Sequence, residues 1–87
     1  MQTHYLADSI AISTSGKKFK PSFDIKKFAF YTEDGNYIVR IRCGDTWGPW
    51  INGFPYVEMS DDMACIEIEI KALSGTIQIY YFIRGEK

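Results

Sequence analysis

The sequence predicts an all-β, single-domain fold: an antiparallel β-sandwich or partly closed barrel of six or seven short strands. The first observation is a strict apolar/polar alternation over 64–72 and 77–84, on both sides of Ser74-Gly75. This alternation is typical of strands with one buried face, so a C-terminal β-hairpin is expected. The second observation is that no stretch keeps a helical period for longer than a turn. At 87 residues the chain has the size of one domain, 1–87.

Composition excludes several function classes. Apolar residues make up 46% of the chain and aromatic residues 16%, which is too apolar for a disordered segment. A net charge of −1 and a pI near 5.7 provide no basic field for nucleic acid. No signal peptide and no run of about 18 apolar residues that could cross a membrane is recognisable. No nucleic-acid or membrane partner is therefore expected.

The strands are expected, in chain order, over 9–14, 25–32, 37–43, 57–59, 64–72 and 77–84. Residues 1–7, which include His4, are expected to form an extended N-terminal arm. Glu33-Asp34-Gly35-Asn36 carries an Asp-Gly pair, which indicates a second hairpin between 25–32 and 37–43. Ser60-Asp61-Asp62 is expected to be a turn.

The two cysteines are expected to be free thiols. Cys43 continues the inward register of Tyr37, Val39 and Ile41, whereas Cys65 is in register with outward glutamates. Side chains on opposite faces of a sheet cannot form a disulfide, because the Cβ atoms must face each other. Free thiols are consistent with a reducing compartment.

Charged residues alternate on two strands. Arg40 and Arg42 share one outer face, and Glu67 and Glu69 share another. If these strands are neighbours, the four side chains form a structural charge ladder that fixes strand register. The alternative is an arginine pair that binds an anionic partner.

Residues 44–56 form the most distinctive loop, since both tryptophans of the chain, three glycines and two prolines lie within it. Its aromatic side chains are Trp47, Trp50, Phe54 and Tyr56. They could plug one end of the core, bury themselves against another protein, or stack on a glycan. The residues alone leave these three interpretations open.

The last strand is apolar on both sides near its end. If Ile77, Ile79 and Ile83 face the core, Tyr80 and Phe82 point outward, where polar residues are expected. An exposed apolar patch usually marks an interaction site. We therefore expect a protein interface formed by Tyr80 and Phe82 together with the N-terminal residues His4 and Tyr5.

Catalytic and metal chemistry find no support in the residues. The sole histidine is His4, and nucleophilic catalysis needs an imidazole held rigidly beside its nucleophile. A metal site needs several convergent ligands, which one histidine and two separated cysteines do not provide. We expect no enzyme activity, no catalytic or metal residues and no cofactor.

Several stretches resemble the small β-sandwich proteins of tailed-phage virions: head decoration, head-fibre or tail-associated subunits. They are 9–16, 23–30, Pro55-Tyr56-Val57-Glu58 and 74–81. The resemblance implies a non-enzymatic bacteriophage structural protein, an oligomer or part of a virion, located in the virion or the host cytoplasm. The Trp47-Gly48-Pro49-Trp50 loop departs from this pattern and is more similar to loops of discoidin-like or fibronectin-like sandwiches. The alternatives are a carbohydrate-binding module and a small protein inhibitor that docks on one target.

Overall fold

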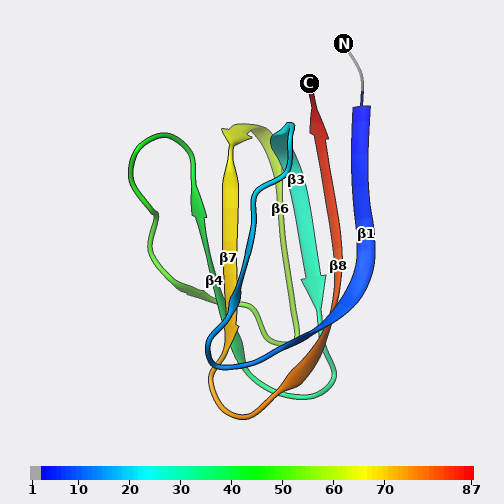
Figure 1. The fold of residues 1–87 in the computed structure, drawn as a ribbon, viewed down its shortest axis with the longest axis vertical. Coiled ribbons are helices and arrows are strands. Elements are labelled where there is room, and N and C mark those ends of the chain that lie inside the picture. Colours follow the sequence, from blue (N-terminus) through cyan, green and yellow to red (C-terminus); the bar gives the residue numbers. More distant parts are fainter. Residues whose placement is uncertain (1–2) are drawn as a thin grey trace.

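The computed structural model describes residues 3–87, except for the side chains of 60–64. The described chain forms two four-stranded antiparallel sheets and contains no helix (Figure 1). The all-β prediction is confirmed, but the number of strands is eight rather than six or seven. Their bounds are β1 Thr3–Ile12, β2 Lys17–Phe19, β3 Asp24–Tyr31, β4 Tyr37–Arg42, β5 Ile51–Asn52, β6 Tyr56–Cys65, β7 Glu67–Ala72 and β8 Ile77–Glu86.

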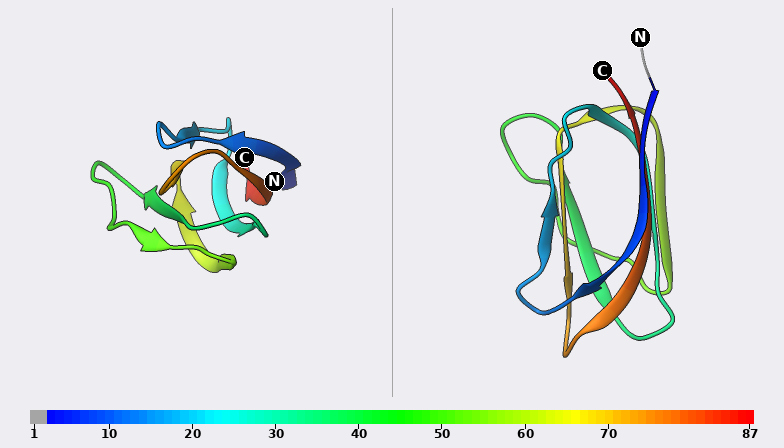
Figure 2. Two further views of the ribbon diagram at one scale, coloured as in Figure 1. Left: turned by 90° about the horizontal axis from the view of Figure 1, so that it is seen from below. Right: turned by 45° about the vertical axis from the view of Figure 1, so that its right-hand side comes forward.

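The strand order is that of a jelly roll. One sheet, here called sheet A, has the order β1-β8-β3-β6, and sheet B has the order β2-β7-β4-β5. Figure 2 shows the two layers from two further sides. Eight strands in two facing sheets, with the chain passing repeatedly between them, define this architecture.

Both predicted hairpins are wrong. β7 lies in sheet B and β8 in sheet A, so the Ser74-Gly75 turn crosses between the sheets. β3 and β4 are separated in the same way. Gly35 does not adopt the positive φ of a tight hairpin turn. Asp34 instead accepts a hydrogen bond from the backbone N–H of Gln78 at 3.0 Å, which ties this crossing loop to β8.

The core lies between the sheets and follows the predicted alternation. Phe28, Phe30, Ile79 and Ile83 face inward from sheet A, opposite residues of sheet B. The inward-facing residues of sheet B include Phe19, Tyr37, Val39, Ile68 and Ile70. The Tyr37 hydroxyl crosses the core and donates a hydrogen bond to the carbonyl of Phe30 at 3.1 Å. A buried polar group is thereby satisfied, as a packed interior requires.

β1 includes most of the segment 1–7, for which the sequence predicts an extended N-terminal arm. From Thr3 onward the chain pairs with β8, in a register that runs from Thr3 opposite Glu86 to Ile12 opposite Ile77. Residues 1–2 lie outside the described residues. The N-terminal segment is therefore ordered by its own C-terminal strand.

The expected turn at Ser60-Asp61-Asp62 is also wrong, because β6 continues through these residues to Cys65. The pairing with β3 is irregular at this point: Lys27 lies opposite Ser60, while Ile25 lies opposite Cys65. A β-bulge absorbs such extra residues without ending the strand. It also restores Ile25 to the buried face.

A disulfide joins Cys43 to Cys65, which corrects the expectation of two free thiols. The register argument failed because it was extended past the strand ends. Cys43 follows the last residue of β4, and Cys65 ends β6 in sheet A, before the chain crosses to β7 in sheet B. Cys65 is fully buried rather than in register with outward glutamates. Both cysteines of the sequence are used in this bond.

Candidate functional site

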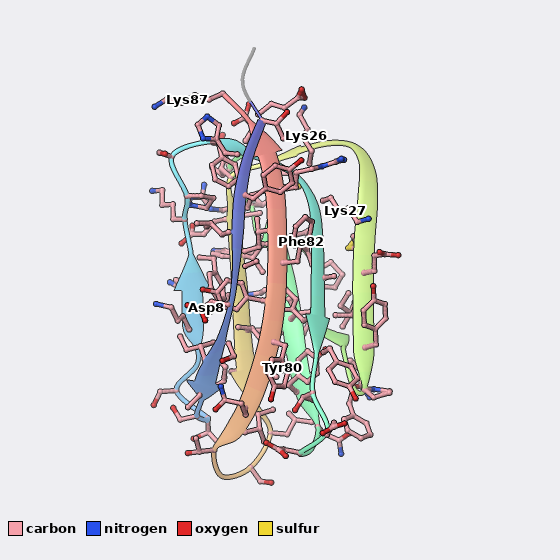
Figure 3. The ribbon with its side chains drawn as sticks, turned by 90° about the vertical axis from the view of Figure 1, so that its right-hand side faces the viewer. Asp8, Lys26, Lys27, Tyr80, Phe82 and Lys87 are labelled. Carbon is pink, nitrogen blue, oxygen red and sulfur yellow. A yellow bond between two sulfur atoms is a disulfide. The ribbon has the colours of Figure 1, made fainter. Side chains whose placement is uncertain are left out.

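The outer face of sheet A carries a cluster of aromatic side chains, which we call the aromatic face. Strand pairing brings them together, since Tyr31 on β3 lies opposite Tyr80 on β8 and Tyr56 on β6. Figure 3 looks onto this face, with Tyr80 and Phe82 on the outer side of β8. The members of the aromatic face are Tyr5, Tyr31, Tyr56, Tyr80 and Phe82.

These rings are in contact with one another yet open to solvent. The centroids of Tyr31 and Tyr80 are 6.2 Å apart, and those of Tyr5 and Phe82 are 5.7 Å apart. Tyr5 is 60% exposed, while Tyr56 and Tyr80 are each 51% exposed. No other segment of the described chain covers them (Figure 3). A cluster of exposed apolar side chains usually marks an interaction surface.

A shallow groove of about 210 Å³ lies in the middle of the aromatic face. Its floor includes Ala29, and its walls include the rings of Tyr31, Tyr56, Tyr80 and Phe82. None of the residues that line it carries a formal charge. The groove therefore favours a flat apolar or aromatic group and provides no acid or base for catalysis.

The phenols of Tyr31 and Tyr56 remain neutral at ordinary pH, because the pKa of each is raised. The hydrogen bond from the Tyr31 hydroxyl to Glu33, 2.9 Å long, raises the pKa of Tyr31. Burial makes the largest contribution to the raised pKa of Tyr56. Both groups are thus apolar rings with a neutral hydroxyl, a combination that is common in protein interfaces.

The two N-terminal interface candidates, His4 and Tyr5, lie on opposite sides of β1. Tyr5 joins the aromatic face through Phe82. His4 points the other way, and its ring is stacked on Phe23 at 5.4 Å with an angle of 10° between the planes. Its Nε2 atom is buried without a hydrogen-bond partner among the described residues. The structure therefore does not bring His4 together with Tyr80 and Phe82.

The loop of residues 44–56, here called the Trp loop, folds back over the outer face of sheet B. The guanidinium of Arg40 lies 4.6 Å from the ring centroid of Trp47 and 4.5 Å from that of Trp50. Lys71 lies 4.7 Å from the ring centroid of Trp50. Neither indole belongs to the buried core. Cation–π contacts thus hold both rings against the sheet.

The other two aromatic residues of this loop lie elsewhere. Tyr56 begins β6 and belongs to the aromatic face, whereas Phe54 is 42% exposed in the preceding turn. The four aromatic side chains that the composition singled out therefore do not form one site. Both tryptophan rings already carry cations, so a sugar could stack only on the ring area that these contacts leave open.

β4 and β7 are neighbours, and the four charged side chains pair across them. Arg40 lies opposite Glu69 with a shortest distance of 2.7 Å, and Arg42 lies opposite Glu67 at 2.8 Å. The hydrogen bond from Arg42 lowers the pKa of Glu67. Arg42 also donates to the carbonyl of Gly44 at 2.9 Å. The two guanidinium groups are thus engaged within the chain.

Among the described residues, no group of three or more His, Cys, Asp or Glu side chains could hold a metal ion. No helix in that part of the chain is long and apolar enough to cross a membrane.

Sequence comparison provides no family for the chain: no family model matches it, and no curated protein matches it. A solved structure from Bacillus endospore appendages, described as a novel family of disulfide-linked pili, has a similar fold. Its TM-score is 0.53 and its sequence identity 15%, over 98% of this chain and 90% of the other. At this identity the likeness concerns the fold. That structure is an appendage protein, whereas the sequence resemblance pointed to phage virion subunits.

Two of the five residues of the aromatic face, Tyr31 and Tyr56, were not assigned to it from the sequence. Alternation placed Tyr80 and Phe82 outward, and the same alternation was available for Tyr31, which is out of phase with Phe28 and Phe30. Tyr31 and Tyr56 join the patch because β3 lies between β8 and β6. That adjacency is a property of the jelly roll and is not visible in any single strand.

Proposed function

We propose that the chain is a non-enzymatic structural subunit of a larger protein assembly and that it contacts neighbouring subunits through the aromatic face. The observation that carries this proposal is the exposure of Tyr80, at 51%, in the centre of a sheet face where polar residues are expected. Protein interfaces are enriched in tyrosine and phenylalanine.

The solved structure with a similar fold supports the proposal of a structural subunit. The similar solved structure is described as belonging to disulfide-linked pili, and a pilus is built from repeated subunits. In this chain both cysteines are joined to each other, which leaves neither for a covalent link between subunits. We therefore propose non-covalent contacts.

Two kinds of assembly are candidates, a phage virion and an extracellular appendage. The sequence resemblance favours a tailed-phage virion, while the similar fold is that of an extracellular appendage. The intrachain disulfide favours an assembly that functions in an oxidising environment over the host cytoplasm. Capsid and tail genes beside the coding sequence would support the virion, and appendage or export genes would support the surface fibre.

A velocity gradient of the native source tests the proposal, with the untagged chain detected by antibody. We expect the wild-type chain to sediment with particles much larger than 10.0 kDa. Tyr80→Arg should move most of it to the position of the free chain, because a buried unpaired charge disrupts an apolar contact. Ser74→Arg, in an exposed turn, is the matched control and should sediment like the wild type. Recovery of the wild-type chain only at the free position would overturn the proposal.

A further inference from the structure

The two outer faces of the jelly roll differ in what covers them. The outer face of sheet B is occupied by the chain's own Trp loop, with Trp47 and Trp50 held over Arg40. The outer face of sheet A has no such cover among the described residues (Figure 3). Any flat partner therefore has one open sheet face on which to dock.

We propose that the occupant of the aromatic face is a second copy of the chain, docked face to face about a two-fold axis that passes close to Ala29 and Phe82. This inference rests on the proposed function, because it names the partner for the same surface. A two-fold contact joins a patch to itself, so the patch must contain both the projections and the hollows that receive them.

The aromatic face contains both. Phe82 lies between two alanines, opposite Ala7 on β1 and Ala29 on β3. The short side chain of Ala29 leaves the groove of about 210 Å³, while Tyr80 projects at its margin. Under a two-fold axis, Tyr80 of each copy enters the groove of the other. One such insertion therefore occurs on each side of the axis.

The available area suits a pair of copies. Sheet A has four strands, of which β1, β6 and β8 have 10 residues each. Four strands about 4.8 Å apart and about 33 Å long present roughly 600 Å². Two such faces bury roughly 1,200 Å², which is the lower end of the range for stable specific interfaces.

The charges around the aromatic face permit self-contact. Basic residues at one end of this face are interspersed with acidic ones, and Lys27 lies 3.5 Å from Glu58. Arg84 and Glu86 line one small hollow together with Lys26. Figure 3 shows Lys27 between Phe82 and Lys26 along the sheet, and the strand register puts it level with Tyr5. Two copies therefore meet without a large like-charge penalty.

The outer face of sheet B is less suited to self-contact. Arg40 and Arg42 are balanced by Glu69 and Glu67, but Lys71 lies over Trp50 and Lys18 over Trp47, 5.8 Å from the ring centroid. A self-contact would bring these lysines of the two copies together. Like charges that face each other across an interface oppose association.

Cysteine cross-linking of the purified chain tests the two-fold arrangement. Ala29→Cys places a thiol beside the proposed axis, where the thiols of two copies meet. Under mild oxidation it should form a covalent dimer at least tenfold faster than Ser74→Cys, whose thiol lies in an exposed turn far from the axis. Rates that are equal for the two variants would overturn the two-fold proposal.

Sedimentation equilibrium provides the second measurement. The wild-type chain should associate to two copies, and Tyr80→Arg should weaken that association at least tenfold while circular dichroism and the melting temperature stay unchanged. A wild-type chain that stays monomeric up to about 1 mM, or an association that Tyr80→Arg leaves unchanged, would overturn the inference. The sedimentation-equilibrium results on the purified chain do not determine the outcome of the velocity gradient on the native source. The two-fold pairing and the proposed structural function can therefore fail separately.

Discussion

The guanidinium of Arg40 lies over the indole of Trp50, 4.5 Å from the ring centroid, while its Nε donates to Glu69 at 2.8 Å. One side chain therefore links β7 to the Trp loop. Ion pairs on a surface contribute little, but a guanidinium that also stacks on aromatic rings is more constrained and less hydrated. Arg40 therefore holds the two indoles on sheet B, while the pairing of β5 with β4 anchors the end of the loop.

Arg40→Met should loosen the packing of Trp47 and Trp50 on sheet B. Loss of the stacking and of the bond to Glu69 should lower the free energy of unfolding by about 1–3 kcal/mol. Both tryptophans of the chain lie in this loop, so their fluorescence emission should shift to longer wavelength as they become solvated. Arg40→Lys is the matched control: it retains the charge but not the planar fork, and it should give an intermediate result. Unchanged emission in Arg40→Met would contradict this role.

Reduction of the Cys43–Cys65 disulfide should destabilise the fold. The bond joins residues 22 positions apart and closes a loop that contains Trp47 and Trp50. By the chain-entropy argument, a loop of this length contributes about 3 kcal/mol. Urea unfolding with and without a reductant measures this difference, and a variant with Cys43→Ser and Cys65→Ala should match the reduced chain. Equal midpoints for the oxidised and reduced chains would show that the bond adds nothing.

Glu67 should make stability dependent on pH in the acid range. The hydrogen bond from Arg42 lowers the pKa of Glu67 in the folded chain. The ionised form thus stabilises the fold, fully above the unfolded pKa of about 4.3, and this contribution is lost as pH falls through the folded pKa. The difference in unfolding free energy between the wild type and Glu67→Gln should therefore be largest near pH 7 and shrink below about pH 4. Glu58→Gln, in the exposed pair with Lys27, should differ little from the wild type at any pH.

Gly53→Ala should be destabilising, because a Cβ at this position would meet the ring of Tyr37. The Gly53 N–H also donates to the Tyr37 carbonyl at 3.0 Å, which fixes the close approach. Overpacking a buried site costs about 1–3 kcal/mol. Gly35→Ala is the matched control, since its Cβ would have ordinary contact with Ile77 at 3.5 Å. Chemical denaturation of both variants checks the prediction, which fails if their midpoints agree.

The fold could be predicted from the sequence as far as local periodicity extends. Alternation identified the longer strands and the buried faces of Phe28, Phe30, Ile79 and Ile83, because a period of two depends only on neighbours in the chain. It did not identify the short strands β2 and β5. It could not identify partners, since Ser74-Gly75 serves a crossing between sheets as well as a hairpin. The free-thiol expectation failed for a related reason: register is lost where the chain changes sheets between Cys65 and Glu67.

The candidate site was predictable in part. The outward positions of Tyr80 and Phe82 follow from alternation alone. The contribution of Tyr56 requires knowledge that β6 lies beside β3, and the contact of Arg40 with both indoles requires the path of an irregular loop. Composition singled out this loop but carries no information on which surface it covers.

The pairing of β1 with β8 determines when the molecule can form. Thr3 lies opposite Glu86, so β1 leaves the ribosome long before the strand that pairs with it (Figure 1). Until synthesis reaches β8, both β1 and β3 lack a neighbour, and exposed strand edges are prone to aggregation. Folding of sheet A therefore waits for the synthesis of β8, and truncation before Ile77 should leave a chain that is prone to aggregation.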